Sequence, residues 1–365
     1  MATMFKNLFM LTSLKVFFTS QVCRSSTTMM RSVMQNKFGD AEEFYISENT
    51  PVPQPKADQI LLRVYAASLN RADILMREGK YPGLKNVITL GLDASGVVES
   101  VGSNCTKWKA GDKVMALLNG GGYAEYAVVN QDHVMPMPDH LSFIESAAIP
   151  EVWLTAYQLL HFVGNMESNE TVLVHGGGSG VGTAAIQLVK MAKSQSIVTA
   201  GTTRKIDFAK QLGAFAGFNY KEGEFAEKVK SATQGKGVNL ILDCVAGSFW
   251  KQNIDCLATE GRWVVYGTLG GRNVDGPLLG QVIAKRASII GTTLKARSND
   301  YKARLVAAFS ENAVPHFTEG NQNLHPVIDQ VFPLESVAES HKYMESNKSN
   351  GKIVLVVKDR SHGEL

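Results

Sequence analysis

The stretch His175–Gly182 has the residue types that hold the phosphates of a dinucleotide. It follows an apolar run, Thr171–Val174, and precedes an amphipathic helix that we predict over Thr183–Lys193. Glycine permits the tight turn from strand to helix and keeps Cβ atoms away from the free N–H groups that face a pyrophosphate. Aligned on its last glycine, the stretch has the pattern G-x-S-x-x-G, with Ser179 in place of the fingerprint's second glycine and Gly180 beside it to allow close approach. This pattern predicts a dinucleotide site.

The second predicted strand indicates which dinucleotide fits. About 20 residues after the loop, an NAD site places an acid on the ribose 2′-hydroxyl, and that negative charge would repel a 2′-phosphate. Here Ala200–Lys205 contains no acid and instead supplies two threonine hydroxyls, an arginine and a lysine. Because threonine also caps helices and lysine is often only solvated, the missing acid is the informative feature. The stretch predicts NADPH as the cofactor.

Composition excludes several function classes. Of 365 residues, 44% are hydrophobic and 19% are charged, a balance that argues against a disordered, collagenous or many-helix membrane protein. The formal net charge is +3, and five basic residues precede the first acid, Asp40, so the rest of the chain lacks a bulk positive field. We therefore expect no nucleic-acid partner, and the apolar run Asn7–Phe18 is too short to span a bilayer.

The cysteines are widely scattered at Cys23, Cys105, Cys244 and Cys256. None forms the close pairs that a disulfide-stapled domain or a structural zinc site uses. This usage favours a reducing compartment.

Residues 1–29 have the composition of a targeting segment. They carry no acid, many serines and threonines, and basic residues at wide intervals, which is typical of a mitochondrial transit peptide. A secretory signal is a competing interpretation, although Lys15 interrupts the apolar run, and a leader on a cytosolic protein is another. The terminal His362–Leu365 differs by one residue from an endoplasmic-reticulum address, which we treat as coincidence without a signal peptide. We expect a mitochondrial or cytoplasmic location.

Residues 30–152 are predicted to be mostly β. Apolar runs alternate with glycine-rich turns, as in short antiparallel strands. Beyond a first strand and turn at about 30–45, these runs are Gln59–Ala67, Asp93–Val101, Lys113–Leu118 and Tyr123–Val129. Helices are predicted next, over Ser142–Ala148 and Trp153–Phe162.

The middle of the chain then has the pattern of a parallel sheet. Short apolar runs are separated by helix-length segments, which is typical of βαβ units. The runs are Thr171–His175, Ser196–Ala200, Leu240–Val245, Trp263–Tyr266 and Ser288–Gly291. After about Ala308 the earlier pattern returns, with strands at Val327–Val331 and Ile353–Val357 and a helix near Ser336–Glu345. We predict an α/β protein in which the tail rejoins a β-rich first lobe, so that the doubly wound parallel sheet is inserted in that lobe.

Several segments carry a family resemblance. Gly91–Val98 and Ile149–Ala156, together with the phosphate loop, are similar to the medium-chain dehydrogenase/reductase superfamily. Ser68–Asp73 and His341–Glu345 resemble the NADPH:quinone oxidoreductases within it, and the similarity extends over about Met30–Val357. The resemblance implies a GroES-like catalytic domain at 30–152, a Rossmann NADPH-binding domain at 153–308, a return to the catalytic domain at 309–365, and an active site in the cleft between the lobes.

The chain departs from the zinc enzymes of that superfamily. Those enzymes use Cys, His and Asp or Glu ligands, because a Lewis acid must hold the developing alkoxide. Here Ser68–Asp73 contains no cysteine, and Gly91-Leu92-Asp93 stands where the zinc enzymes have Gly-His-Glu. A four-cysteine lobe is also missing, and the eight histidines are dispersed. We expect a metal-free site.

Without a metal, hydride must go to an acceptor that is already electron-poor, such as a quinone or an enone. The protein then has to position the acceptor and donate hydrogen bonds to the forming oxyanion. By the resemblance, Asn70 matches a cleft residue near the nicotinamide and Tyr81 matches a tyrosine that lines the substrate opening. Asn70 can donate through its amide and Tyr81 through its phenol, so they are the catalytic candidates; a turn-stabilising asparagine and a packing tyrosine are the alternatives.

The resemblance also implies a cofactor-binding set and a homodimer. The residues that match the family's NADPH groove are Thr155, Gly180, Val181, Gly201, Lys205, Tyr220, Cys244 and Tyr266. Lys205 and Tyr220 would hold the 2′-phosphate, and Cys244 would contact the adenosine side rather than act as a redox thiol. Sheet edges at Trp263–Tyr266 and Ser288–Gly291 could meet in the dimer.

Two other functions stay open at this point. An enoyl-thioester reductase would suit a mitochondrial leader, but a CoA ester needs cations near the cleft entrance, and none can be placed from the sequence. A dinucleotide-binding structural or regulatory protein without catalysis is the third hypothesis. Turnover assays with NADPH and quinones or enoyl-CoA, together with a measurement of NADPH binding, discriminate among the three functions.

Overall fold

The structure is a computed structural model that describes residues 28–319 and 324–358. The predicted leader, apart from residues 28 and 29, and the terminal His362–Leu365 lie outside the described residues, so the hypotheses about them stay untested. Within the described ranges, no helix combines the length and apolar character needed to cross a membrane.

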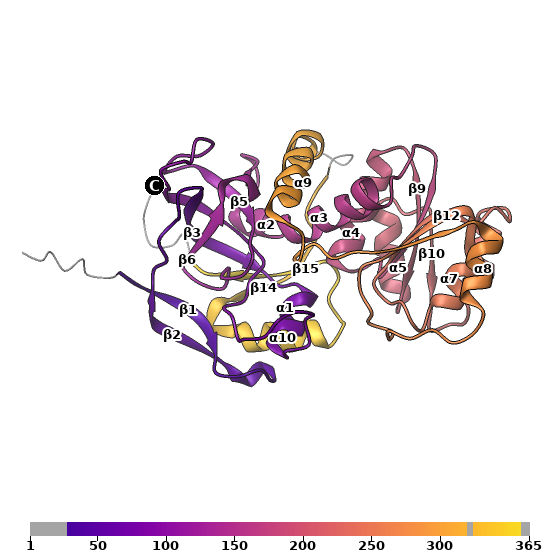
Figure 1. Cartoon of the computed structure of the whole chain (residues 1–365), viewed down its shortest axis with the longest axis horizontal. Coiled ribbons are helices and arrows are strands. Elements are labelled where there is room, and N and C mark those ends of the chain that lie inside the picture. The colour runs from indigo at the N-terminus through magenta and orange to yellow at the C-terminus, as the bar shows by residue number, and fades with distance from the viewer. Residues whose placement is uncertain (1–27, 320–323, 359–365) are drawn as a thin grey trace, which may run out of the picture.

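The first lobe is built on antiparallel strands (Figure 1). The larger sheet has the order β14-β15-β3-β4-β5-β7, with β6 also paired to β3, and β1 pairs with β2 separately. The strands are β1 (Met29–Gln35), β2 (Phe44–Pro51), β3 (Gln59–Ser68), β4 (Asp93–Val101), β5 (Lys113–Leu117), β6 (Tyr126–Asn130), β7 (Val134–Pro136), β14 (Ile328–Pro333) and β15 (Lys352–Val356). Strand β15 pairs antiparallel with β3, so the end of the chain joins the first lobe's sheet.

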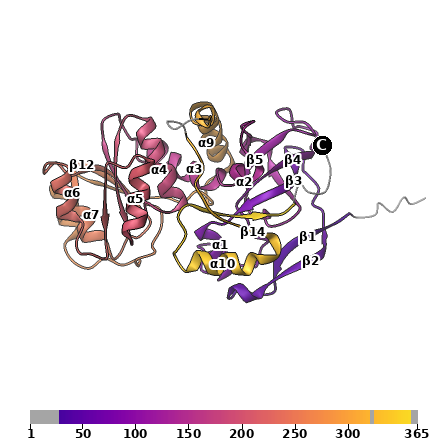
Figure 2. The ribbon, with the colours of Figure 1, turned by 180° about the vertical axis from the view of Figure 1, so that it is seen from behind.

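Short helices cover this lobe. The α-helices are α1 (Arg71–Arg77), α2 (Phe143–Ala147) and α10 (Val337–Glu345). Single 3-10 turns are η1 (Ala41–Glu43), η2 (Gln131–His133), η4 (Val314–His316) and η5 (Leu334–Ser336). Figures 1 and 2 both show α1 and α10 side by side beneath the sheet, although more than 250 residues separate them in the chain.

The second lobe is a parallel sheet with the order β10-β9-β8-β11-β12-β13 and helices on both faces. Its strands are β8 (Thr171–His175), β9 (Gln195–Ala200), β10 (Ala216–Asn219), β11 (Val238–Asp243), β12 (Leu257–Val265) and β13 (Ser288–Gly291). Its helices are α4 (Gly180–Met191), α5 (Thr203–Leu212), α6 (Ala226–Ala232), α7 (Trp250–Cys256) and α8 (Leu278–Lys285). This is the doubly wound Rossmann order, in which ligands bind beyond the carboxyl ends of the strands at the β8/β11 switch point. The predicted fold class is confirmed.

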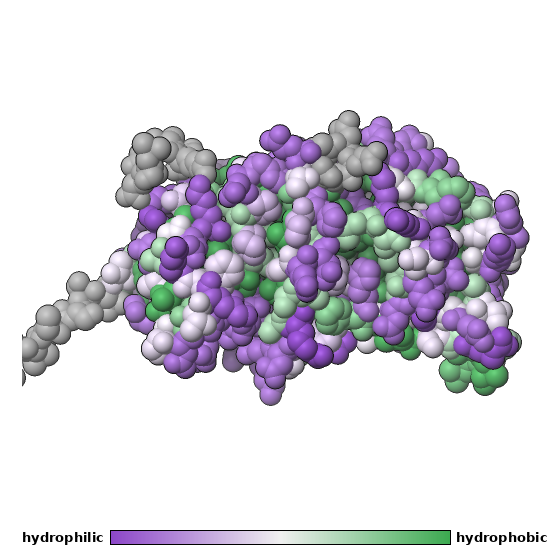
Figure 3. Space-filling model, turned by 90° about the horizontal axis from the view of Figure 1, so that it is seen from above, coloured by the Kyte–Doolittle hydropathy of each residue, from purple (hydrophilic) through white to green (hydrophobic). Residues whose placement is uncertain are grey.

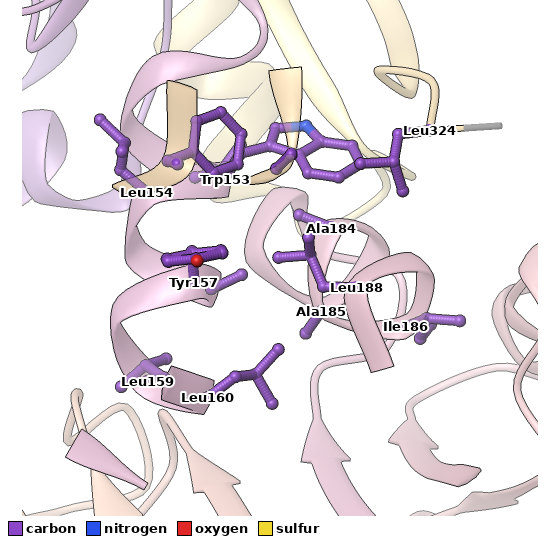
Figure 4. Close-up of a cluster of buried hydrophobic side chains, with 14 of the residues drawn as sticks. Trp153, Leu154, Tyr157, Leu159, Leu160, Ala184, Ala185, Ile186, Leu188 and Leu324 are labelled. Atoms are coloured by element: carbon purple, nitrogen blue, oxygen red, sulfur yellow. The ribbon is translucent and has the colours of Figure 1, made fainter. Parts of the chain in front are cut away.

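Two helices between the lobes share one hydrophobic cluster with both sheets. They are α3 (Pro150–Tyr157), which continues as a π-helical turn η3 (Gln158–Val163), and α9 (Asn299–Asn312). Figure 4 shows Trp153 and Tyr157 of α3 facing Ala184 and Leu188 of α4. The same cluster includes Met115 from the first lobe's sheet. Burying each such large side chain contributes about 1.5–3 kcal/mol, so the lobes are held together by a continuous core.

The structure differs from the sequence predictions mainly at strand β10 and helix α3. Strand β10 was not predicted because Ala216–Asn219 contains a glycine and an asparagine, which strands disfavour. The helix predicted over Trp153–Phe162 begins at Pro150, a favourable first position, and changes to π-helical pairing at Gln158. The strand predicted from Tyr123 begins three residues later, at Tyr126.

The phosphate loop depends on Gly182. A Cβ atom there would lie 2.2 Å from the carbonyl oxygen of Gly176, which stands at φ +70° where the loop turns. We expect Gly182→Ala to lower the free energy of unfolding by about 1–3 kcal/mol, because backbone rather than a movable side chain must give way. The matched control is Gly280→Ala in the exposed helix α8, where nothing lies within 4 Å and alanine should stabilise by about 0.5–1 kcal/mol. Chemical denaturation of both variants measures the contrast; equal stability would contradict it.

Candidate active site

The phosphate loop ends in a capped helix. Ser179 is the N-cap of α4, and its hydroxyl accepts a hydrogen bond from the Gly182 N–H at 3.0 Å. The fingerprint's second glycine is therefore replaced by a residue that stabilises the helix start. The first lobe reaches this loop directly, because the Gly351 N–H donates to the Gly178 carbonyl at 2.8 Å. Val181 lies in the first turn of α4.

The residues predicted for the 2′-phosphate gather after strand β9. Tyr220 lies over Gly201, where a Cβ atom would be 2.7 Å from the tyrosine oxygen. Lys205 lies in the first turn of α5, and its ammonium donates to the Asn347 carbonyl at 2.8 Å. Burial lowers the pKa of Lys205, the nearby Asp329 carboxylate opposes that shift, and the cations Arg71, Arg204 and Lys221 add to it. These positive groups lie close enough to repel one another, which is the arrangement that a phosphate dianion stabilises.

Arg71 belongs to this basic cluster and was missed in the sequence analysis. Its guanidinium donates to the Asn347 side-chain oxygen at 2.7 Å and to the Met344 carbonyl at 3.2 Å. Burial lowers its pKa, and the interaction with Cys244 places it beside the end of strand β11. The available signal was a cation directly after the candidate Asn70, at the start of helix α1.

Cys244 and Tyr266 come directly after the carboxyl ends of β11 and β12. The Cys244 thiol lies 3.8 Å from the His175 carbonyl oxygen, at the start of the glycine loop. Burial raises the pKa of Cys244 to about 11, so the thiol stays protonated at neutral pH. Burial and the neighbouring Cys244 raise the pKa of Tyr266 well above its usual range. Both groups are hydrogen-bonding neutral side chains rather than redox or acid–base groups.

A buried hydrogen-bond network beneath the loop was also missed. Asp243, fully buried, accepts hydrogen bonds from Trp263 Nε1 at 2.8 Å and Asn253 Nδ2 at 2.9 Å. The Asn253 oxygen accepts from His175 Nε2 at 2.7 Å, and His175 Nδ1 lies 2.8 Å from the Thr199 hydroxyl. Burial lowers the pKa of His175, so the ring is neutral, and the network fixes its tautomer. It ties together the carboxyl ends of β8, β9, β11 and β12.

Asn70 is held by a buried ammonium. It is the N-cap of α1, and its side-chain oxygen accepts from Lys352 Nζ at 2.6 Å. The same ammonium donates to the Leu69 carbonyl at 2.7 Å and lies 3.7 Å from the Asp93 carboxylate. Lys352 thereby fixes which end of the amide is the acceptor. The Asn70 Nδ2 group makes longer hydrogen bonds, 3.3 Å to Asp93 and 3.4 Å to the Ser68 carbonyl.

Carboxyl groups surround this lysine. Asp73 is fully buried and accepts from the Asn70 and Gly91 N–H groups at 2.9 and 3.1 Å. Burial, and then repulsion from Asp93, raise the pKa of Asp73 to about 7. Glu151, on α3, has its pKa raised to about 7 by burial, with Lys352 opposing that shift. The predicted cofactor residue Thr155 lies one turn further and donates to Glu151 at 3.4 Å.

Tyr81 lies beside this cluster, partly buried against the first lobe's core. Burial raises its pKa to about 12, and the Glu151 carboxylate adds to the shift. Its phenol is therefore protonated at neutral pH and can donate a hydrogen bond. The structure thus brings Asn70, Tyr81 and Thr155 around Glu151, and it places the other candidates along the glycine loop and the strand ends.

The donor set does not fit a catalytic zinc. Among the described residues, no three His, Cys, Asp or Glu side chains are arranged so that they could hold a metal ion. Leu92, at the position where the zinc enzymes have histidine, is a buried apolar residue and cannot bind a metal. The positive charge beside the Asp93 carboxylate is the Lys352 ammonium. The counter-charge of Asp93 is therefore supplied by the chain.

Comparisons with known proteins identify the family. Two family models match: an alcohol dehydrogenase GroES-like domain over residues 56–139 and a zinc-binding dehydrogenase over residues 180–311. The quinone oxidoreductase of Homo sapiens is 32% identical over 333 residues, which cover 90% of this chain and 98% of that protein.

Two solved structures illustrate the range of the fold. An NAD-dependent alcohol dehydrogenase is 31% identical with a TM-score of 0.78, covering 90% of this chain and all of the other. The CurK enoyl reductase is 25% identical with a TM-score of 0.80, covering 91% of this chain and all of the other.

The GroES-like lobe and the Rossmann sheet define the class of protein: the chain is a nicotinamide-dependent oxidoreductase. Within that class, the chain belongs to the quinone oxidoreductase family of the medium-chain dehydrogenases/reductases. The resemblance seen in the sequence is confirmed.

The raised pKa of Glu151 predicts a pH dependence of stability. A carboxyl group with a folded-state pKa of about 7, against an ordinary value of 4.5, holds a proton that the unfolded chain releases. Stability from this group is therefore present at low pH and falls as pH rises from about 4.5 to 7. We expect Glu151→Gln to reduce the loss of unfolding free energy between pH 5 and pH 8 by about 1–2 kcal/mol. Urea denaturation at both pH values checks this, with wild type as the reference; parallel pH profiles would refute it.

Proposed function

We propose that this oxidoreductase reduces quinones or related α,β-unsaturated carbonyls with NADPH and without a metal. The observation that carries the proposal is the make-up of the cleft. The Asn70 amide and the Tyr81 phenol can donate hydrogen bonds there, and the Lys352 ammonium holds the Asn70 oxygen. When bound, the reduced nicotinamide supplies the hydride. Such groups can stabilise a delocalised oxyanion, whereas a simple alkoxide needs a Lewis acid.

Asn70 would position the nicotinamide end of the cofactor. The Leu69 carbonyl accepts a hydrogen bond from the Lys352 ammonium, and the same ammonium holds the Asn70 side-chain oxygen. The amide N–H groups are left with the long contacts to Asp93 and Ser68, which a ligand can replace at small cost. Asn70 would have this role in addition to its structural one, because it is also the N-cap of helix α1.

Tyr81 would donate a hydrogen bond to the oxygen of the acceptor. With its pKa raised to about 12, the phenol keeps its proton in the resting site and can donate a hydrogen bond to a forming oxyanion. The nearby Glu151, with a pKa of about 7, can exchange a proton with solvent at neutral pH. Tyr81 would therefore stabilise charge, and the carboxyl group would buffer the proton that the product takes up.

The basic cluster supports NADPH rather than NADH. Lys205 lies beside Gly178 of the loop and Tyr220 beside Gly201, and the last residues of β9 bring no acid there. We infer that these two side chains would hold the 2′-phosphate of the adenosine ribose. Gly201, Cys244 and Tyr266 would line the adenosine and ribose, while Gly180, Val181 and Thr155 would follow the pyrophosphate and nicotinamide. The NAD dependence of one structural relative makes the cofactor preference the first property to measure.

An enoyl-thioester reductase is the second candidate, supported by the likeness to the CurK enoyl reductase. It would use the same hydride and the same oxyanion donors on a conjugated thioester. The composition of residues 1–29 fits a mitochondrial or a cytoplasmic location, and so it does not separate the two reactions. A non-catalytic NADPH-binding protein would keep the groove alone.

We also propose a homodimer through the edge of the parallel sheet. Strand β13 is the edge strand, and helix α8 beside it exposes 77% of both Leu279 and Ile283. Figure 3 shows hydrophobic side chains gathered at this end of the molecule. Trp263 belongs to β12, which is paired on both sides, so β13 is the strand of this pair that a second copy can extend.

Removal of the Lys205 charge tests the cofactor. We expect Lys205→Ala to raise the dissociation constant for NADPH by at least about tenfold and that for NADH by less than about twofold, because only NADPH has the additional phosphate. Fluorescence titration of both cofactors measures the difference. Lys210→Ala, at an exposed position on the same helix, is the control and should change neither. Equal weakening for both cofactors would contradict the assignment.

Acceptor turnover tests the reaction. We expect purified protein with NADPH to reduce orthoquinones and small quinones, and Asn70→Ala and Tyr81→Phe to lower kcat/KM by about 10–100-fold, since each removes a group at the reacting end. Tyr45→Phe, at a tyrosine that is 44% exposed, is the control. Reduction of enoyl-CoA alone would favour the thioester reaction. Tight NADPH binding with no acceptor reduced would favour the non-catalytic protein.

A further inference from the structure

The buried network beneath the glycine loop has no role in the proposed reaction. Its members are His175, Thr199, Asp243 and Asn253, which are fully buried, and Trp263, which is 2% exposed. Asn253 belongs to helix α7, and the other four lie at or near the carboxyl ends of β8, β9, β11 and β12. Buried polar groups are costly unless they are hydrogen-bonded, and a paired network holds its members in one arrangement.

The hydrogen bonds of this network have one direction. Trp263 Nε1 and Asn253 Nδ2 both donate to Asp243, at 2.8 and 2.9 Å. The Asn253 oxygen therefore faces His175, and it accepts the Nε2 proton at 2.7 Å. The lowered pKa of His175 leaves the ring neutral, so Nδ1 carries no proton and accepts from the Thr199 hydroxyl at 2.8 Å. The chain of donors runs from Thr199 to the Asp243 carboxylate.

The same carboxylate holds the turn that contains Cys244. Asp243 Oδ1 accepts hydrogen bonds from the Val245 and Ala246 N–H groups at 2.7 and 3.0 Å. Ala246 stands at φ +62°, a conformation that residues with a Cβ atom rarely adopt. Such a backbone persists only where its surroundings enforce it, and here the two hydrogen bonds do so. The network therefore also places Cys244, the residue predicted for the adenosine side.

One contact of His175 holds the strand that leads to the predicted 2′-phosphate residues. The Thr199 hydroxyl is bound to the His175 ring, and the Thr199 carbonyl accepts a hydrogen bond from the Gly177 N–H at 3.0 Å. Thr199 is thus joined to the glycine loop through its side chain and through its backbone. Gly201 follows two residues later, and Lys205 lies in the first turn of α5 just beyond it. The contact therefore sets where the chain carrying Lys205 leaves the sheet.

A second contact of His175 leads to Tyr220 through an aromatic ring. The His175 ring packs edge-on against Phe249, with 5.1 Å between the ring centroids. Phe249 packs in the same way against Tyr220, at 5.5 Å. The tyrosine oxygen in turn lies against Gly201. Since edge-on ring pairs have a preferred geometry, the orientation of His175 is passed on to Tyr220.

We propose that His175 is a positioning residue for cofactor selection, which acts through Thr199 and Phe249 on the groups that receive the 2′-phosphate. The inference rests on the proposed use of NADPH. A phosphate is held only when several donors converge on it at hydrogen-bond distance, whereas the 2′-hydroxyl of NADH makes a smaller demand. The spacing between Lys205 and Tyr220 therefore matters more for NADPH than for NADH. Selection thus depends on the network beneath these residues as well as on their own chemistry.

Two substitutions of Thr199 test the network with the smallest change. Thr199→Val keeps the shape of the side chain and removes the hydroxyl donor, whereas Thr199→Ser keeps the donor. We expect Thr199→Val to raise the dissociation constant for NADPH by about three- to tenfold and that for NADH by less than about twofold, because one hydrogen bond orders the 2′-phosphate groups. Thr199→Ser should keep the wild-type ratio of the two constants. Fluorescence titration of the purified protein with both cofactors measures them.

Thr233→Val is the matched control. The Thr233 hydroxyl also makes a hydrogen bond within the second lobe, to the Val229 carbonyl at 3.0 Å, but it lies before the amino end of β11. Its removal should change neither dissociation constant. His175→Phe keeps an aromatic ring against Phe249 and loses both ring hydrogen bonds, so it should lower the preference for NADPH as Thr199→Val does. If His175→Phe does not fold, Thr199→Val decides.

The outcomes separate this inference from the proposed function. If Thr199→Val is less stable but keeps the wild-type ratio of the two constants, the network is only structural and the inference is overturned, while the use of NADPH stands. An equal effect of Thr199→Ser and Thr199→Val also overturns it. If the wild type binds both cofactors equally, the NADPH proposal fails, and calorimetric binding of 5′-AMP decides. Weaker binding in Thr199→Val but not in Thr199→Ser supports positioning of the adenosine end by His175, and equal binding overturns it.

Discussion

One buried cation connects the groups that the active site needs. Lys352 is 3% exposed, and its ammonium is satisfied by the Leu69 carbonyl, the Asn70 amide and the Asp93 carboxylate. Desolvating a cation costs several kcal/mol unless such partners are fixed in place, so this contact constrains three segments of the first lobe. The stem of the lysine also occupies the space above Gly180, where a Cβ atom would lie 2.8 Å from Lys352 Cδ. The last strand, the first helix and the phosphate loop are therefore set relative to one another by a single side chain.

Charge is graded from the glycine loop toward Lys352. Near the loop, burial lowers the pKa values of Arg71 and Lys205, while Glu345 and Asp329 oppose these shifts. Near Lys352, Asp73 and Glu151 have pKa values raised to about 7, so they carry only part of a negative charge at neutral pH. This grading suits a cofactor whose charges lie in its phosphates and whose reactive ring is close to neutral. It also keeps negative charge low where an oxyanion must form.

The sequence indicates elements with strong local signals and misses contacts between distant segments. Strands β4, β8 and β13 were predicted with their observed bounds, because apolar runs and glycine turns mark both ends. The contact between Asn70 and Lys352 joins residues 282 positions apart, and no local pattern contains it. The network of His175 and Asp243 was missed for the same reason, since each residue alone resembles an ordinary strand end. Substitution patterns across many relatives could have exposed such pairs, whereas one chain gives only spacing.

Two buried lysines show how differently the fold can satisfy a cation. Lys352 and Lys302 are each 3% exposed. The ammonium of Lys352 has a carboxylate and two carbonyl-type oxygens around it, so its charge is compensated by the fold. The ammonium of Lys302 has the Asn119 amide oxygen as its partner and the like charge of Lys295 nearby. Burial therefore lowers the pKa of Lys302 to about 8, because a neutral oxygen offsets less of the lost hydration than a carboxylate does.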